Sequence, residues 1–208
     1  MARSKSSNQW LQRHVKDPYV RKARSDGYRS RAAFKLIEID TRDRLLARGA
    51  RVVDLGAAPG GWSQVAARKV APGGTVIAVD LLEIAPMSGV TVLRGDCRDA
   101  GIQAQLAAAL GGHKADVVLS DMSPNISGIA SADQARAAEL VQMAMDFCRA
   151  QLQKDGVFLV KVFQGGEFAG LLKELKGMFR EVRVIKPAAS REESRETYLL
   201  ARGLKGIQ

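Results

Sequence analysis

From residue 51 onward, short runs of apolar and β-branched residues alternate with stretches of helix length. The runs, each bounded by glycine, aspartate or proline, are RVVDL, TVIAVD, VTVLRGD, DVVLSD and VFLVKVF. Helix-length stretches separate them, namely WSQVAARKV, then residues 99–110, the alanine-rich 131–153, and 167–179. Parallel strands need a crossover between them and are usually covered on both faces. The alternation therefore predicts an α/β fold with a doubly wound, mostly parallel sheet.

Two further strand-like runs, EVRVIK and ETYLLA, close the chain, and only a polar connection, PAASREESR, lies between them. Without a crossover helix the two runs are expected to pair antiparallel at one edge, which gives about seven strands and one antiparallel edge strand. The sequence contains no internal repeat and no interdomain linker. With 208 residues the chain is most simply one domain.

The formal net charge of +10 is concentrated at the start of the chain. Residues 1–51 hold 14 of the 32 Lys and Arg but only 5 of the 22 Asp and Glu. Clustered basic residues release counterions from nucleic acid, so we expect residues 1–50 to form a basic RNA-binding arm, with DPYVRKARSDG as a short helix. Trp10, Tyr19 and Tyr28 lie among the charges, where they either stack on bases or anchor the arm to the body. A solvated basic tail is the alternative.

Cysteine and histidine usage points away from disulfides and metals. Cys97 and Cys148 stand far apart, no CxxC is present, and the histidines are His14 and His113. This pattern suggests neither a disulfide framework nor a zinc site, and it indicates a reducing compartment. No apolar run reaches the ~18 residues of a membrane span, and MARSKSSNQ at the start has no apolar core. We expect a cytoplasmic monomer without a membrane partner or a metal.

The ends of the expected strands carry polar residues at the edge where doubly wound sheets bind ligands. The first strand runs into a glycine-rich turn, Asp54-Leu55-Gly56-Ala57-Ala58-Pro59-Gly60-Gly61-Trp62. Asp80 ends the second strand about 20 residues after this turn, where a carboxylate can accept both hydroxyls of a ribose. Asp96 ends the third strand, within reach of an adenine amino group. These positions predict a site for an adenosine-containing cofactor.

Two cofactors compete for the glycine-rich turn. Gly56, Ala58 and Gly61 come near the dinucleotide fingerprint, which favours a nicotinamide cofactor. Pro59 argues against it, because proline removes a backbone N–H where the turn must cradle a pyrophosphate. S-adenosylmethionine has no phosphate. Its binding site needs a backbone that comes close to its amino-acid moiety, a carboxylate that binds its ribose, and a place for its adenine. S-adenosylmethionine is therefore the expected cofactor.

Two residues at the ends of the fourth and fifth strands suggest the chemistry. The fourth strand ends in Ser120-Asp121-Met122-Ser123-Pro124-Asn125. Amino-directed methyltransferases often place an aromatic residue where Asn125 stands. Its absence here argues against methylation of a base nitrogen and leaves a hydroxyl group as a possible acceptor. Lys161 lies inside the apolar run FLVKVF, and a charged residue is rarely buried without a partner or a task. Lys161 is either an ion-pair partner of Asp121 or a catalytic group beside the methyl donor.

The segments SRAAFKL, VVDLGAAPGGWSQ, AVDLL, GDCRD, SDMSPNISG, VKVFQG and SRETY occur together in this chain. On these segments, from about Trp10 to Arg202, the chain resembles the FtsJ (RlmE) family of ribosomal RNA large-subunit ribose 2′-O-methyltransferases. The resemblance implies a Rossmann-like class I methyltransferase domain over residues 51–208. The catalytic residues that it implies are Lys35, Asp121, Lys161 and Glu196. The cofactor-binding residues that it implies are Gly60, Trp62, Asp80, Asp96 and Asp121.

The implied reaction is methyl transfer from S-adenosylmethionine to the ribose 2′-hydroxyl of a uridine in the A-loop of 23S rRNA, on the assembled 50S subunit. Some tRNA enzymes share the four catalytic residues, so a tRNA ribose methyltransferase stays an alternative. A nicotinamide oxidoreductase and a non-catalytic ribosome-assembly protein are weaker alternatives. Lys161→Ala is expected to abolish transfer while the cofactor still binds. Charge reversal at Arg29 and Arg31 is expected to weaken RNA binding and leave cofactor affinity unchanged.

Overall fold

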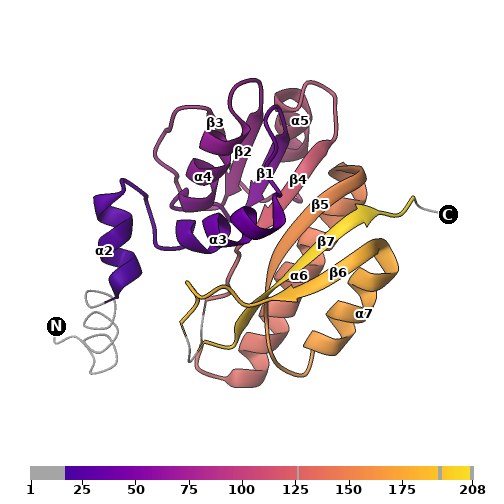
Figure 1. Cartoon of the computed structure of the whole chain (residues 1–208). Coiled ribbons are helices and arrows are strands. Elements are labelled where there is room, and N and C mark those ends of the chain that lie inside the picture. Colours follow the sequence, from indigo (N-terminus) through magenta and orange to yellow (C-terminus); the bar gives the residue numbers. More distant parts are fainter. Residues whose placement is uncertain (1–16, 126, 192–193, 207–208) are drawn as a thin grey trace.

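The computed structural model describes residues 17–125, 127–191 and 194–206, and its centre is one seven-stranded sheet (Figure 1). The strands are β1 (Arg51–Leu55), β2 (Thr75–Asp80), β3 (Val90–Arg94), β4 (Ala115–Ser120), β5 (Leu152–Phe163), β6 (Phe179–Ile185) and β7 (Glu196–Leu204). The helices are α2 (Pro18–Ser25), α3 (Ala33–Asp43), α4 (Gly61–Val70), α5 (Ala100–Ala109), α6 (Ala130–Gln151) and α7 (Phe168–Met178).

The sheet has the strand order β3-β2-β1-β4-β5-β7-β6, and β1 to β5 pair in parallel. β1, β2 and β4 are buried over nearly their whole length, as expected of strands that are covered on both faces. The doubly wound sheet predicted from the alternation of strands and helices is therefore confirmed. Its order reverses between β1 and β4, and this is the switch point where such sheets bind ligands.

The last two strands pair antiparallel at one edge of the sheet, as the sequence predicted, but the strand that runs against its neighbours, β7, lies one position inside that edge and not at it. β7 lies between β5 and β6 and runs antiparallel to both (Figure 1). The reason is burial, because most of β7 is buried while the middle of β6 is largely exposed. An inner strand must be apolar on both faces, and of these two strands only β7 meets that condition.

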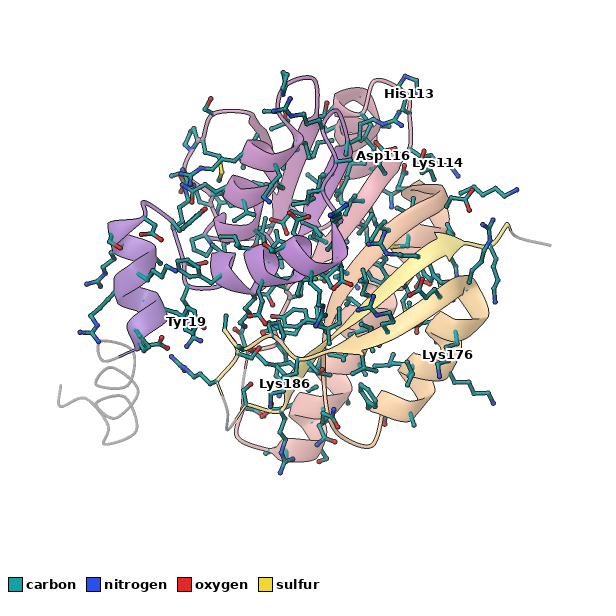
Figure 2. The ribbon with its side chains drawn as sticks, viewed as in Figure 1. Tyr19, His113, Lys114, Asp116, Lys176 and Lys186 are labelled. Carbon is teal, nitrogen blue, oxygen red and sulfur yellow. The ribbon has the colours of Figure 1, made fainter. Side chains whose placement is uncertain are left out.

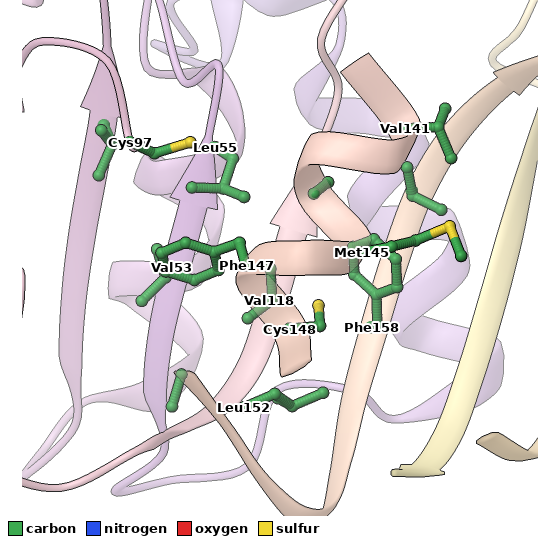
Figure 3. Packing of buried hydrophobic residues seen from close by; sticks show 14 of the residues in the cluster. Val53, Leu55, Cys97, Val118, Val141, Met145, Phe147, Cys148, Leu152 and Phe158 are labelled. Atoms are coloured by element: carbon green, nitrogen blue, oxygen red, sulfur yellow. The ribbon is translucent and has the colours of Figure 1, made fainter. Parts of the chain in front are cut away.

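Helices cover the two faces of the sheet in separate apolar clusters. α5, α6 and α7 contribute to one cluster and α3 and α4 to the other. Figure 3 shows the first, where Met145 and Phe147 of α6 lie among Val53, Val118 and Phe158 of the strands. Adjacent strand residues alternate between the clusters, as the pleat requires. Both faces are therefore closed by helices, and polar function is left to the strand ends.

The described part of the predicted basic arm starts just before α2, which confirms the short helix predicted there. Asp17 caps this helix by accepting a hydrogen bond from the Tyr19 backbone N–H at 3.0 Å. The rings of Tyr19 and Tyr28 lie 5.6 and 5.5 Å from that of Phe34, and Figure 2 shows Tyr19 on α2. Tyr19 and Tyr28 also pack in one cluster with Ala189, and the Arg68 guanidinium of α4 lies over the Tyr28 ring, so these two aromatic residues anchor the arm to the body. Trp10 lies outside the described residues. No helix in the described ranges is long and apolar enough to cross a membrane.

Candidate active site

A cavity of about 450 Å³ opens at the carboxyl ends of β1, β2, β3 and β4, at the edge that the sequence predicted. Its volume lies within the roughly 300–1,000 Å³ of small-molecule sites. The residues that line it are Leu55, Gly56, Ala58, Val79, Asp80, Leu81, Leu82, Gly95, Asp96, Cys97, Arg98, Asp121, Met122, Ser123, Glu139, Leu140 and Met143. Among these are three of the predicted cofactor residues, the aspartates at positions 80, 96 and 121.

The Asp80 carboxylate ties together the two loops that frame one side of the cavity. Its Oδ2 accepts a hydrogen bond from the Ala58 backbone N–H, and its Oδ1 accepts one from the Leu82 backbone N–H, both at 2.8 Å. A carboxylate has about four acceptor positions, so each oxygen keeps one for a ligand hydroxyl. Asp80 therefore connects the two loops and also offers a hydrogen-bond acceptor to the cavity.

Asp96 is held by one arginine two residues further along the chain. Arg98 Nη2 lies 2.6 Å from Asp96 Oδ2, and the Arg98 backbone N–H donates to Asp96 Oδ1 at 2.9 Å. The hydrogen bond from the Arg98 guanidinium lowers the pKa of the Asp96 carboxyl below its ordinary value. Asp96 thus presents an ionised acceptor at the cavity wall.

The glycine-rich turn approaches the cavity closely at Gly56. A Cβ at this position would come within 2.2 Å of the Met122 Cγ, and the backbone has a φ of +70°. Both the space and the left-handed conformation require glycine here. The turn therefore presents bare backbone to a ligand in the cavity.

The other two predicted cofactor residues, Gly60 and Trp62, are not among the described residues that line the cavity. Gly60 precedes α4 with a φ of +104°. The Trp62 side chain is buried in the cluster beneath α3, where its Nε1–H donates to the Ala32 carbonyl at 2.8 Å and its ring lies 5.7 Å from that of Tyr198. Trp62 is therefore a core side chain in this structure.

Asp54, to which the sequence assigned no role, is a buried acid at the end of β1. Its Oδ2 accepts a hydrogen bond from the Ser63 hydroxyl at 2.6 Å, but its Oδ1 has no partner among the described residues. Burial raises the pKa of Asp54 to about 7, and the nearby charges of Asp121 and Asp80 add to the rise. An aspartate inside the apolar run RVVDL was the signal available in the sequence.

The four predicted catalytic residues form two ion pairs. Lys161 Nζ donates to the Asp121 backbone carbonyl at 2.7 Å and lies 3.2 Å from Asp121 Oδ1. Lys35 Nζ, from α3, lies 2.6 Å from Glu196 Oε1 at the start of β7. Both lysines are buried, each with 7% of its surface exposed. Because Asp121 also lines the cavity, the first pair lies directly beside it.

Tyr198 joins these two pairs, and the sequence assigned it no role. Its hydroxyl donates to Asp121 Oδ1 at 2.8 Å, and its ring centroid lies 5.7 Å from Lys35 Nζ. Cross-strand register places it opposite Lys161, and Glu196 lies two residues before it on the same face of β7. Burial raises the pKa of Tyr198 well above its ordinary value, so the hydroxyl remains a donor. Its position two residues after Glu196, in SRETY, was the signal in the sequence.

Arg29 and Arg31, which the sequence assigned to RNA binding, are engaged within the chain. The Arg29 guanidinium donates to three backbone carbonyls, and the Arg31 guanidinium pairs with Asp17 and donates to the Ala189 carbonyl. Two of the three acceptors of Arg29 belong to the loop after β2, beside the cavity. The expectation that charge reversal at Arg29 leaves cofactor affinity unchanged therefore does not follow from these contacts.

His113, Cys97 and Cys148 take no part in the two ion pairs. His113 and Asp116 mark the amino-terminal end of β4, opposite to the cavity (Figure 2). Cys97 and Cys148 are free and buried, and burial raises the pKa of Cys97 to about 11. Within the described ranges no group of three or more His, Cys, Asp or Glu could hold a metal ion. His14 lies outside those ranges.

Comparison with known proteins gives one consistent family. The profile of FtsJ-like methyltransferases matches residues 28–204. Ribosomal RNA large subunit methyltransferase E of Chromohalobacter salexigens is 53% identical over 203 residues, which is 98% of this chain and 97% of that protein. The enzyme of the same name from Pseudomonas aeruginosa is 50% identical over 206 residues, 99% of this chain and 100% of that protein. A Plasmodium falciparum crystal structure assigned as a ribosomal RNA methyltransferase superposes with a TM-score of 0.79 at 30% identity, covering 86% of this chain and 100% of that one.

Proposed function

The chain belongs to the FtsJ-like methyltransferase family, and from this membership we infer that it transfers a methyl group from S-adenosylmethionine to large-subunit ribosomal RNA. The acceptor that we propose is the ribose 2′-hydroxyl of a uridine in the A-loop of 23S rRNA, on the assembled 50S subunit. The observation that carries the choice of a hydroxyl acceptor is the buried Lys161, which Asp121 holds beside the cavity. We also propose that residues 1–50 act as the RNA-binding arm of a methyltransferase domain over 51–208.

The cavity suits S-adenosylmethionine on three observations. The Asp80 carboxylate faces it with unused acceptor positions for ribose hydroxyls. Gly56 allows the close backbone approach that an amino-acid moiety needs. The unpartnered Oδ1 of Asp54 is a buried acceptor behind the same turn. When bound, S-adenosylmethionine supplies a methyl group that its sulfonium charge already activates, so the protein has to align the acceptor and manage charge.

We propose that Lys161 acts on the acceptor oxygen. An ammonium group has three N–H donors, and one of them donates to the Asp121 backbone carbonyl, while Asp121 Oδ1 lies 3.2 Å from the nitrogen as its ion-pair partner. A further donor remains for the 2′-oxygen, where it would stabilise the negative charge that develops as this oxygen bonds to the methyl group and its proton passes to water. Asp121 thus fixes the direction of that donor. Positioning of this kind can supply about 7 kcal/mol or more of the barrier reduction.

The second pair supports the same acceptor. Lys35 comes from α3 and Glu196 from β7, so their contact at 2.6 Å fixes α3 to the strand that pairs with the strand of Lys161. Glu196 lies on the same face of the sheet as Lys161, because it stands two residues before Tyr198, the cross-strand partner of Lys161. We propose that this pair holds the ribose and its neighbouring phosphate while Lys161 contacts the 2′-oxygen.

The function is tested by transfer of labelled methyl groups. The acceptors are 50S subunits from cells that lack this protein, free 23S rRNA, and total tRNA, and products are digested and analysed for 2′-O-methyluridine. We expect label in 2′-O-methyluridine from 50S subunits. Label in tRNA alone would favour the tRNA alternative, and binding of the cofactor without transfer to any RNA would contradict the enzymatic proposal.

We propose in addition that the protein acts as a monomer in the cytoplasm, where ribosomal subunits mature. All of the proposed catalytic residues come from one chain, so a second copy is not needed to complete the site. Light scattering during size-exclusion chromatography tests this, and a mass of twice the 22.4 kDa chain would contradict it.

A further inference from the structure

Arg29 bridges the two loops that frame the cofactor cavity. Its Nη1 donates to the Ala85 carbonyl at 2.5 Å and to the Pro59 carbonyl at 3.3 Å, and its Nη2 donates to the Pro86 carbonyl at 2.7 Å. Pro59 belongs to the glycine-rich turn, and Ala85 and Pro86 belong to the loop after β2. The guanidinium therefore joins two segments that Asp80 also connects through their backbone N–H groups. Ala57 and Ala58 of the turn pack in one apolar cluster with Ile84 and Met87 of the loop, so Arg29 adds a polar link to this packing.

Arg29 is itself fixed by the start of α4. Its backbone N–H donates to Gln64 Oε1 at 3.1 Å, while Gln64 Nε2 donates to the Gly27 carbonyl at 2.7 Å. Gln64 thus holds the arm on both sides of Tyr28. The direction of the Arg29 side chain is set by these backbone contacts, so the arm and the glycine-rich turn act as one packed unit.

Gly61 shows how closely the arm lies on this turn. A Cβ at Gly61 would lie 2.2 Å from Ser30 Oγ and 3.4 Å from Ser30 Cβ. Gly61 has no left-handed φ, so the backbone itself would accept alanine. A methyl group at this position would therefore meet the arm at Ser30, whose hydroxyl would have to move.

We propose that Arg29 is a positioning residue that couples RNA binding by the arm to cofactor binding in the cavity. When RNA holds the arm in place, Arg29 holds the two loops at the separation that the cofactor needs. The coupling rests on the proposed function only in that RNA is the ligand of the arm. The effect of Arg29 on cofactor affinity does not depend on that assumption, because its three hydrogen bonds lie within the chain.

Thermodynamic linkage makes this coupling measurable from both sides. If bound RNA raises cofactor affinity by some factor, bound cofactor must raise RNA affinity by the same factor. Coupling between sites typically amounts to about 5- to 150-fold. A residue that supports only the fold would weaken both ligands or neither, and it would not remove the dependence of one on the other.

The experiment compares Arg29→Met with Arg24→Met, which removes the same charge from an exposed position on α2. Calorimetry with S-adenosylhomocysteine, which is not consumed, gives cofactor-site affinity, and filter binding of free 23S rRNA with and without S-adenosylhomocysteine gives the coupling. For Arg29→Met we expect S-adenosylhomocysteine to bind about tenfold more weakly and the coupling factor to fall toward one. For Arg24→Met we expect only RNA affinity to fall.

Equal S-adenosylhomocysteine affinity in the two variants would overturn the inference. Binding by the unmodified protein without methyl transfer to any RNA would instead contradict the proposed function, while the comparison of the two variants would still stand. Thermal unfolding of both variants checks that neither has lost its fold.

A second pair of variants tests the packing of the arm independently. Gly61→Ala should weaken S-adenosylhomocysteine binding, because its methyl group meets Ser30 Oγ and lifts the arm from the turn. Ser30→Ala in the same chain removes that oxygen and should restore the affinity, as a double-mutant cycle would report. If Ser30→Ala gives no recovery, Gly61 serves the cofactor directly and the role assigned to the arm is wrong.

Discussion

Asp54→Asn should make the protein more stable than the unmodified chain at neutral and alkaline pH, and equally stable in acid. The Asp54 carboxyl is buried, its Oδ1 has no partner among the described residues, and Asp121 and Asp80 lie near enough to repel its charge. Burial first, and then this repulsion, raise the pKa of Asp54 from 3.8 to about 7. The ionised form is therefore the unfavourable one in the folded chain.

The direction in which stability changes with pH follows from the number of protons that Asp54 binds in the folded and unfolded states. Between pH 3.8 and about 7, Asp54 is ionised in the unfolded chain but protonated in the folded one, so the unfolded state binds fewer protons. Stability then falls as pH rises through this window. Above the window the unfolding free energy has been lowered by the full cost of ionising Asp54. A pKa rise of this size corresponds to about 4 kcal/mol, which is a substantial part of the ~5–15 kcal/mol of a typical domain.

Asparagine keeps the shape and removes the titration. Its Oδ1 can still accept the hydrogen bond from Ser63, and its amide group has no charge to lose. We would measure urea unfolding of both proteins from pH 4 to 9 and plot the difference in unfolding free energy. The difference should grow with pH up to about pH 7 and then level off. A flat difference, or one that favours the aspartate at high pH, would refute the reasoning.

Three further variants test the site and its support. Lys161→Ala should abolish methyl transfer while calorimetry with S-adenosylhomocysteine gives unchanged affinity, and retained turnover would contradict its role. Tyr198→Phe removes the 2.8 Å hydrogen bond to Asp121 and should lower kcat about tenfold, equivalent to about 1.4 kcal/mol, with KM for S-adenosylmethionine unchanged. Asp17→Asn leaves Arg31 and Arg191 without their carboxylate partner and should lower stability by about 1–3 kcal/mol, seen as a lower urea midpoint at constant m. An unchanged midpoint would show that Asp17 contributes little.

The sequence could predict the residues at strand ends because their positions depend on local pattern alone. Each apolar run ends where an aspartate follows it, so Asp80, Asp96 and Asp121 meet at one edge once the strands are parallel. The same logic could not show that Trp62 is a core side chain. Its burial depends on α3 and Tyr198, which lie far away in the sequence.

The contacts of Arg29 show most clearly what the sequence could not predict. Its acceptors lie 30, 56 and 57 residues away, and all three are backbone carbonyls, which no residue pattern marks. A basic residue in a basic segment predicts only a charged surface. The guanidinium faces either RNA or the protein's own loops, depending on which later segments the tertiary fold brings next to the arm. The local sequence does not contain this information.

The inner position of β7 explains how a residue at the start of a strand joins residues at the ends of others. Parallel strands bring only their carboxyl ends to the ligand edge, which supplies Asp121 just after β4 and Lys161 near the end of β5. β7 runs the other way, so its first residue, Glu196, pairs in register with Phe163, the last residue of β5. Had β6 paired with β5 instead, Glu196 would lie one strand further from Lys161. The choice of inner strand, which burial of β7 decides, therefore also brings Glu196 within reach of Lys35 on α3.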